Sequence, residues 1–318
     1  MWTWAEWIAD AVLRVTGLDP AAGPGAALHF FVYDLLKITV LIAGVAFLMA
    51  LIRGALPLEK IRRGLDRPGG QLLGYPAAAL FGALTPFCSC SSVPVFLGFV
   101  QARFPIGVAF AFLITSPLVN EIAVALLAAV FGWKFALAYA MSGIGLGIAG
   151  GLTLTLLHAE RWLVPGAVAP AGEEEEAPLH GWRARLRDAA ATSGHILRKI
   201  APWLVGSLAL GASLHGFVPE GFFQKLFAGR SAWTVPLASL AGLPLYVSAN
   251  ATVPLLEAFV AKGVPLGTAL AFLLSAVGVS LPELIMLRSV MTVRLLVVFS
   301  LVVVVGTTLI GWLFNALQ

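Results

Sequence analysis

The chain has 318 residues, of which 59% are hydrophobic and only 11% are charged, and its formal net charge is +4. A soluble domain usually carries about 25% charged residues, so this composition excludes an ordinary soluble protein. Most of the apolar runs approach the roughly 20 residues that a helix needs to cross a bilayer, and they lack the polar alternation of membrane β-barrel strands. We therefore predict an all-α polytopic membrane protein. The runs are Leu35–Ile52, Phe104–Val130, Phe135–Leu157, Trp203–Leu214, Leu266–Leu287 and Leu295–Leu317.

Residues 1–29 are expected to form a separate N-terminal segment. Trp2, Trp4 and Trp7 favour a helix at the membrane interface, where indole rings are enriched, although a short helix packed outside the membrane fits the same residues. The segment lacks the basic start and long apolar stretch of a secretory signal. Most basic residues of the chain lie in two loops, which indicates membrane topology rather than binding of nucleic acid.

Two halves of the chain resemble each other at an offset of 160 residues. A polar linker with Pro, Gly and a run of glutamates separates them. We expect a first membrane repeat at 30–158, a cytoplasmic linker at 159–199 and a second membrane repeat at 200–318. Duplicated transporters commonly place their site at the repeat interface near the membrane midplane. The aligned residues include Gly82 with Gly242, Pro94 with Pro254, Pro105 with Pro265 and Gly107 with Gly267.

Each half contains a polar, proline-bounded interruption, "CSCSSVP" at 88–94 and "SANATVP" at 248–254. The apolar arms around each interruption are too short to span, so either a broken helix or a re-entrant hairpin fits. The positive-inside rule places the basic loop 53–67 and the linker on one face, with an even number of crossings between them. We predict three full spans and one re-entrant hairpin per half, at 72–101 and 232–260, and hence inverted repeats. The alternative has eight or more spans with broken helices and parallel repeats.

Both cysteines of the chain, Cys88 and Cys90, lie in the first interruption. Thiolates select soft ions such as Cu(I) and Zn, and trivalent arsenic extends the same argument. We predict that this pair captures the substrate and acts as a transient metal ligand; packing as small buried hydrophobes is the alternative. The other predicted substrate-binding residues are Ser89, Ser91, Ser92 and Thr85 at the first tip and Ser248, Asn250 and Thr252 at the second. The predicted helix breaks and gating positions are Pro86, Pro94, Pro117, Asn120 and Pro254.

Two glutamates, Glu121 and Glu283, lie inside predicted spans. An ionisable side chain within a membrane is costly and indicates a functional site by default. We treat the two as a quasi-symmetric pair that couples transport to protons. A protonated glutamate that hydrogen-bonds the opposite hairpin as a structural group is the alternative.

Other motifs carry no chemistry. "GLGIAG" matches the dinucleotide pattern but lies in an apolar helix, so Gly145, Gly147 and Gly150 are better explained by close helix packing. The chain has no P-loop sequence, and none of its five histidines forms a spaced ligand pair for a fixed zinc centre. We expect a transporter rather than an enzyme, with no cofactor.

Three stretches, "TPFCSCSSVPVFLGFV", "PIGVAFAFLITSPLVNE" and "ATVPLLEAFVAKGVPLGTALAFLLSA", resemble the bacterial permease family that includes the organoarsenical efflux permease ArsP and the YraQ-like proteins. The resemblance covers most of the chain and implies a multi-pass permease of the bacterial inner membrane. For some members it implies export of trivalent organoarsenicals such as methylarsenite, captured by cysteines that Cys88 and Cys90 match, and for others a link to copper or zinc.

We therefore expect a proton-coupled secondary efflux permease. Its expected partners are a small-molecule substrate and membrane lipid, with a homo-oligomer as an open option. Export of soft metal ions, a membrane thiol oxidoreductase and a substrate-gated channel are the alternatives.

Overall fold

The computed structural model describes residues 3–16, 23–55, 70–85, 89–164, 232–245 and 249–317, with short helical stretches between 186 and 206. Within these residues the chain is helical apart from turns and one isolated bridge, which confirms the predicted all-α class. Most of the apolar run Trp203–Leu214 lies outside the described residues. The named helices are α1 (Thr3–Thr16), α2 (Gly23–Ala55), α4 (Gly70–Leu84), α5 (Ser89–Gln101), α6 (Ile106–Leu118), α7 (Glu121–Phe131), α8 (Trp133–Leu156), η1 (Ala159–Trp162), α11 (Thr234–Gly242), α12 (Ala249–Ala261), α13 (Leu266–Gly278), α14 (Leu281–Leu287) and α15 (Val293–Ala316).

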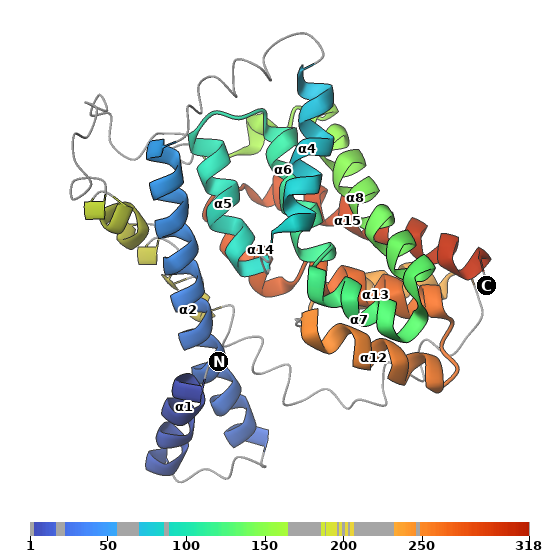
Figure 1. Cartoon of the computed structure of the whole chain (residues 1–318), viewed down its shortest axis with the longest axis horizontal. Helices are drawn as coiled ribbons and strands as arrows, with labels where there is room; N and C mark the ends of the chain where they lie inside the picture. The colour runs from blue at the N-terminus through green and yellow to red at the C-terminus, as the bar shows by residue number, and fades with distance from the viewer. Residues whose placement is uncertain are drawn as a thin grey trace.

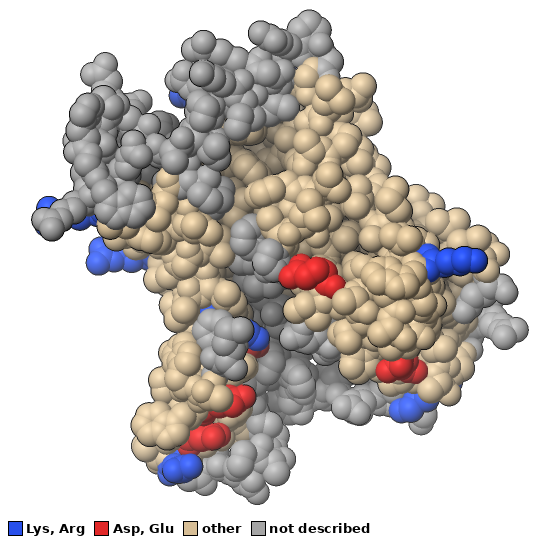
Figure 2. Space-filling view, viewed as in Figure 1, with Lys and Arg blue, Asp and Glu red and all other residues tan. Residues whose placement is uncertain are grey.

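Several helices are long and apolar enough to cross a bilayer. In the described part of the chain these are Phe31–Leu48 within α2, all of α8, Leu266–Leu287 across α13 and α14, and all of α15. α6 and α7 form one further span if the 46° bend between them is counted as a break within it. α5 and α12 are apolar but too short to cross alone. Figure 2 shows a face that is largely uncharged over α4, α6 and α8, as expected of a multi-pass membrane protein.

The N-terminal helix α1 packs against α2 and projects with it from the main bundle (Figure 1). Trp4 and Trp7 are exposed on α1, and His29 Nε2 lies 3.1 Å from Asp10 Oδ1 between the two helices. α2 already begins at Gly23, inside the segment expected to be separate.

The 160-residue offset recurs in the backbone. The bounds of α5, α6 and α8 reappear at that offset as those of α12, α13 and α15. Arg103 and Gly263, one offset apart, both have a left-handed backbone, with φ of 57° and 84°. A side chain added at Gly82 would meet Phe112 O and Ser116 N, and one at Gly242 would meet the equivalent atoms of Phe272 and Ala276. The two halves therefore share one local architecture.

The two helices before and after the first polar interruption, α4 and α5, both pack on α6. Tyr75 and Gly82 on α4 lie beside the beginning and the end of α6, so these helices run parallel. α5 runs the other way, because Phe96 stacks on Phe110 and its earlier residue Ser92 bonds Ser116. α4 and α5 are therefore antiparallel to each other. α5 and α12 both begin near the middle of the molecule (Figure 1).

The halves meet in a reciprocal way, since α5 packs on α14 while the equivalent α12 packs on α7. Leu118 contacts Gly278 and Leu146 contacts Gly306, so each residue of these pairs touches its own repeat counterpart. Reciprocal contacts of this kind are typical of a two-fold relation. α8 and α15 run antiparallel, because Phe135 meets Phe314 edge to face at one end and Gly150 lies beside Val302 further along.

A short staple joins the halves beyond the end of α8. Leu163 forms an antiparallel bridge with Met291, and Val164 N–H donates to Val290 O at 2.9 Å. Trp162 O accepts from both the backbone N–H and the hydroxyl of Thr292, at 3.0 and 2.7 Å. Three basic residues lie close in sequence to the residues of the staple: Arg161, Arg288 and Arg294.

Candidate functional site

The thiol motif lies at the start of α5. Cys88, Pro86 and Ser248 are outside the described residues, and only the backbone is described for Ser89, Cys90, Ser91 and Asn250. α5 begins at Ser89 and α12 at Ala249, which puts Cys90 and Asn250 in the first turn of equivalent helices. Because proline has no N–H, Pro94 and Pro254 leave the carbonyls of Cys90 and Asn250 without their usual helical donor. Each tip therefore offers a backbone oxygen to a polar partner.

Ser92 ties the thiol arm to α6. Its hydroxyl lies 3.1 Å from that of Ser116, and both side chains are fully buried. Ser116 precedes the end of α6 by two residues, so this contact joins the hairpin to the break in the α6–α7 span.

The α6–α7 break is held by side chains of the protein itself. Pro117 lies in the last turn of α6, and Asn120 caps α7 by accepting from Ile122 N–H at 2.7 Å. The Leu118 carbonyl, released from the helical pattern, accepts from Tyr139 OH on α8 at 2.6 Å. Irregular backbone at membrane depth needs such internal partners.

The α13–α14 break has different chemistry. Ser280 takes the place of Asn120 and caps α14 by accepting from Glu283 N–H at 3.4 Å. Gly278 is the counterpart of Leu118, but its carbonyl has neither a tyrosine hydroxyl nor a helical N–H as a donor. Phe299 takes the place of Tyr139, and Pro282 has no N–H. Ser275 Oγ is buried with no hydrogen-bond partner among the described residues.

The two glutamates are not equivalent. Glu283 is fully buried on α14, which packs against α5, whereas Glu121 is exposed in the first turn of α7. At the 160-residue offset Glu121 aligns with residue 281, two positions before Glu283, and two residues turn a helix by about 200°. The two glutamates therefore differ in position and burial, although each lies close to a break, and their coupling to protons stays a prediction.

The remaining predicted residues are dispersed around the tips. Thr85 lies after α4 and donates back to Phe81 O, while Pro94 and Thr252 are buried and Pro254 is exposed. Of the three packing glycines, Gly147 and Gly150 contact Thr115 and Ile114 of α6 as expected, whereas Gly145 faces open space. Within the described residues no group of three or more His, Cys, Asp or Glu side chains could hold a metal ion.

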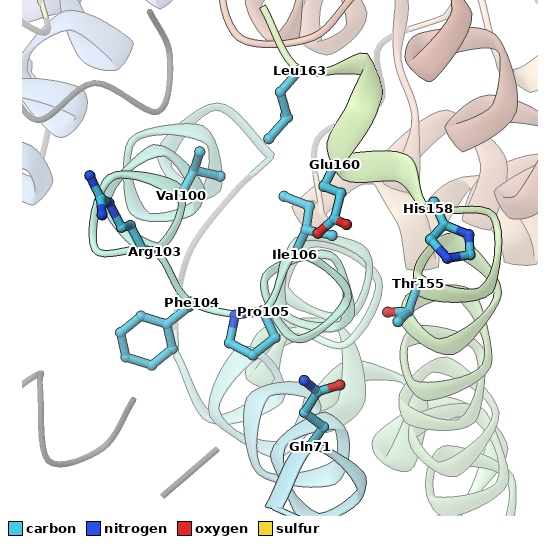
Figure 3. Close-up of a pocket in the computed structure, with 10 residues that line it drawn as sticks. All are labelled: Gln71, Val100, Arg103, Phe104, Pro105, Ile106, Thr155, His158, Glu160 and Leu163. Atoms are coloured by element: carbon cyan, nitrogen blue, oxygen red, sulfur yellow. The ribbon is translucent and has the colours of Figure 1, made fainter. Parts of the chain in front are cut away.

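A cavity of about 630 Å³ lies at the opposite end of α5 from the thiols. Figure 3 shows Gln71, Thr155 and Glu160 pointing toward a common space beside Pro105 and Ile106, with the guanidinium of Arg103 turned away at the rim. Arg103 and His158, the two non-glycine residues with positive φ in the described chain, both line it. Such a backbone is unfavourable for ordinary side chains and often marks a functional region.

Sequence reasoning missed Tyr139, the staple and this cavity. Tyr139 looks like one more aromatic in an apolar run, and the available signal was its alignment with Phe299, which shows that the hydroxyl is unique to the first half.

Comparison with known proteins shows relatives over most of the chain. The chain is 27% identical over 271 residues to UPF0718 protein YraQ of Escherichia coli (strain K12), covering 83% of this chain and 73% of that protein. It is 20% identical over 299 residues to UPF0718 protein MJ0584 of Methanocaldococcus jannaschii, covering 76% and 82%. No solved structure matches it. The ArsP_1 family, described as predicted permease, matches residues 25–316. The chain therefore belongs to the ArsP_1 family of predicted permeases and is a multi-pass membrane transporter rather than an enzyme.

Proposed function

We propose that this permease exports a soft, thiophilic solute across the bacterial inner membrane, and that trivalent organoarsenicals such as methylarsenite are the class that fits best. One observation carries the proposal. The only two cysteines of the chain lead into α5, the helix whose Ser92 is bonded to the end of α6 beside the break. A soft metal ion is the second solute that two thiolates suit.

The capture chemistry is a ligand exchange. Cys88 and Cys90 replace the two hydroxyls of methylarsenite, forming two As–S bonds and releasing two waters, and hydrolysis reverses the exchange on the other side. The partial positive charge at the start of α5 favours a thiolate in its first turn. The Cys90 carbonyl freed by Pro94 can accept from the second arsenic-bound hydroxyl after the first exchange and before that hydroxyl leaves as water. No oxidant or cofactor is required.

Glu283 is the better candidate for proton coupling. It is buried, and its helix α14 packs against α5, so a change of its charge acts next to the thiol arm. Glu121 is exposed and its helix α7 packs against α12, whose tip has no cysteine. Glu121 therefore serves as the matched control for Glu283.

Inverted repeats would give such an exporter its two access states. The antiparallel course of α8 and α15 and the reciprocal contacts of α5 with α14 and of α12 with α7 support repeats of opposite orientation. Rocking of one half against the other then exposes the hairpin tips to each face in turn.

Uptake of methylarsenite into everted membrane vesicles tests the capture step. Cys88→Ser/Cys90→Ser is expected to lower the initial rate at least tenfold, because the serine hydroxyls cannot form the As–S bonds that hold the solute. Gly145→Ala, whose added Cβ meets nothing within 4 Å and which lies outside the predicted site, is the control and should keep most of the rate. Uptake by the double variant equal to that of the unmodified protein would exclude the thiol mechanism, and parallel assays with Cu(I) and Zn identify a metal substrate.

The same vesicles test the coupling. With an imposed pH gradient, Glu283→Gln is expected to abolish the stimulation of uptake by the gradient, while Glu121→Gln retains it. Loss of stimulation in Glu121→Gln alone would assign the proton to the other half. Unchanged stimulation in both variants would show that neither glutamate carries it.

A further inference from the structure

The cavity and the thiol tip lie at opposite ends of α5, and one face of that helix connects them. Ser92, Phe96, Phe99 and Arg103 follow one another at helical spacings of four, three and four residues, from the tip to the cavity rim. A solute that moves between the cavity and the tip along this face passes the two phenylalanine rings.

A row of four rings crosses the first hairpin between these ends. Phe81 of α4 packs on Phe112 of α6 with centroids 5.6 Å apart, and Phe112 meets Phe99 of α5 edge to face at 5.3 Å. Phe99 in turn packs at 5.4 Å on Phe104, which lines the cavity. Phe112 is fully buried. We call Phe81, Phe112, Phe99 and Phe104 the phenylalanine row.

The second half keeps only the centre of this row. Phe259 and Phe272, the counterparts of Phe99 and Phe112, meet edge to face at 5.5 Å. The places of Phe81 and Phe104 are taken by Ala241 and Val264. The central pair of rings is therefore present in both halves, and the row is longer in the half that carries the cysteines.

We propose that the cavity is a solute-binding vestibule of the transport path and that the phenylalanine row is the gate between it and the hairpin tip. The vestibule suits a small solute with both polar and apolar parts. Gln71, Thr155 and Glu160 accept or donate hydrogen bonds, and Val100, Ile106 and Leu163 provide an apolar wall. Leu163 belongs to the staple, so this wall of the cavity is joined to the second half through Met291. The proposal rests on the proposed thiol site but not on the identity of its substrate.

The two native cysteines provide the test. Full-length protein in sealed vesicles of both orientations is exposed to the membrane-impermeant reagent 2-sulfonatoethyl methanethiosulfonate, and modification of the Cys88/Cys90 peptide is followed by mass spectrometry. Phe99→Ala is expected to raise the rate at least tenfold when the reagent is on the cavity face. The equivalent Phe259→Ala should leave that rate within twofold. No increase in Phe99→Ala, an equal increase in Phe259→Ala, or an equal gain from both faces overturns the gate.

A second substitution keeps the test informative if Phe99→Ala fails to fold. Phe99→Trp keeps the aromatic packing and enlarges the ring, so it should slow modification from the cavity face at least threefold; an unchanged rate contradicts the proposal. Labelling needs no transported solute. An increase in Phe99→Ala together with absent methylarsenite transport by the unmodified protein would therefore reject the proposed substrate and keep the gate.

Discussion

Single glycines decide how closely α6 and α8 approach each other. A Cβ at Gly151 of α8 would overlap the Gly107 carbonyl oxygen of α6, and backbone cannot move aside as a flexible side chain can. Gly145 on the same helix has nothing within 4 Å of such a Cβ. We predict that Gly151→Ala lowers the free energy of unfolding by about 1–3 kcal/mol, as overpacked sites do. Thermal unfolding in detergent, followed by tryptophan fluorescence, measures the effect.

Gly145→Ala is the control on the same helix. Alanine is favoured over glycine inside a helix by about 1 kcal/mol, so this variant should be neutral or slightly more stable. A Cβ at Gly311, the repeat counterpart of Gly151, would lie 2.8 Å from the Gly267 carbonyl oxygen, so Gly311→Ala should resemble Gly151→Ala. Equal stabilities of Gly151→Ala and Gly145→Ala would contradict this account of the packing.

At the scale of the element, the two breaks differ in how their backbone is satisfied. Tyr139→Phe removes the donor to the buried Leu118 carbonyl and is expected to cost about 1–3 kcal/mol, the usual penalty for an orphaned buried polar group. Hydrogen exchange should rise at residues 119–122, in the α6–α7 break, more than within α8. Phe299→Tyr, the matched change at the second break, places a hydroxyl near the Gly278 carbonyl and should be neutral or stabilising. Uniform exchange in both variants would show that Tyr139 acts only on global stability.

Elements were also the scale at which sequence was most informative. Aligned prolines and glycines at a fixed offset predicted the hairpin arms and the second copy of α5, α6 and α8, because proline and glycine constrain the backbone directly. The rotation of each helix about its own axis, which decides the residues that face its neighbours, was harder to predict. A run of apolar residues carries little amphipathic signal. Glu121 was therefore paired with Glu283 but is exposed where Glu283 is buried, and Gly145 was expected in a helix contact but faces outward. Contacts between distant segments, such as Trp162 with Thr292, have no local signature.

At the scale of the whole molecule, the relative orientation of the two halves follows from the directions in which their equivalent helices run. α8 and α15 occupy the same place in their halves and run antiparallel, and both are long enough to span. Their first turns carry Lys134 and Arg294, which are one offset apart and both exposed. Antiparallel spanning helices place their first turns on opposite faces of the membrane. Parallel repeats would place both on the same face.

We therefore predict opposite sidedness for this pair. In a Cys88→Ser/Cys90→Ser background, Arg294→Cys should react with an impermeant maleimide in everted vesicles, and Lys134→Cys only in right-side-out vesicles. The positive-inside rule assigns Arg294 to the cytoplasm because it adjoins the basic staple end of the bundle. Arg103→Cys and Lys262→Cys form a second pair, expected to follow Arg294 and Lys134 respectively. Reaction of Arg294→Cys and Lys134→Cys from the same face would rule out inverted repeats, and the two breaks could then not serve as the two sides of an alternating site.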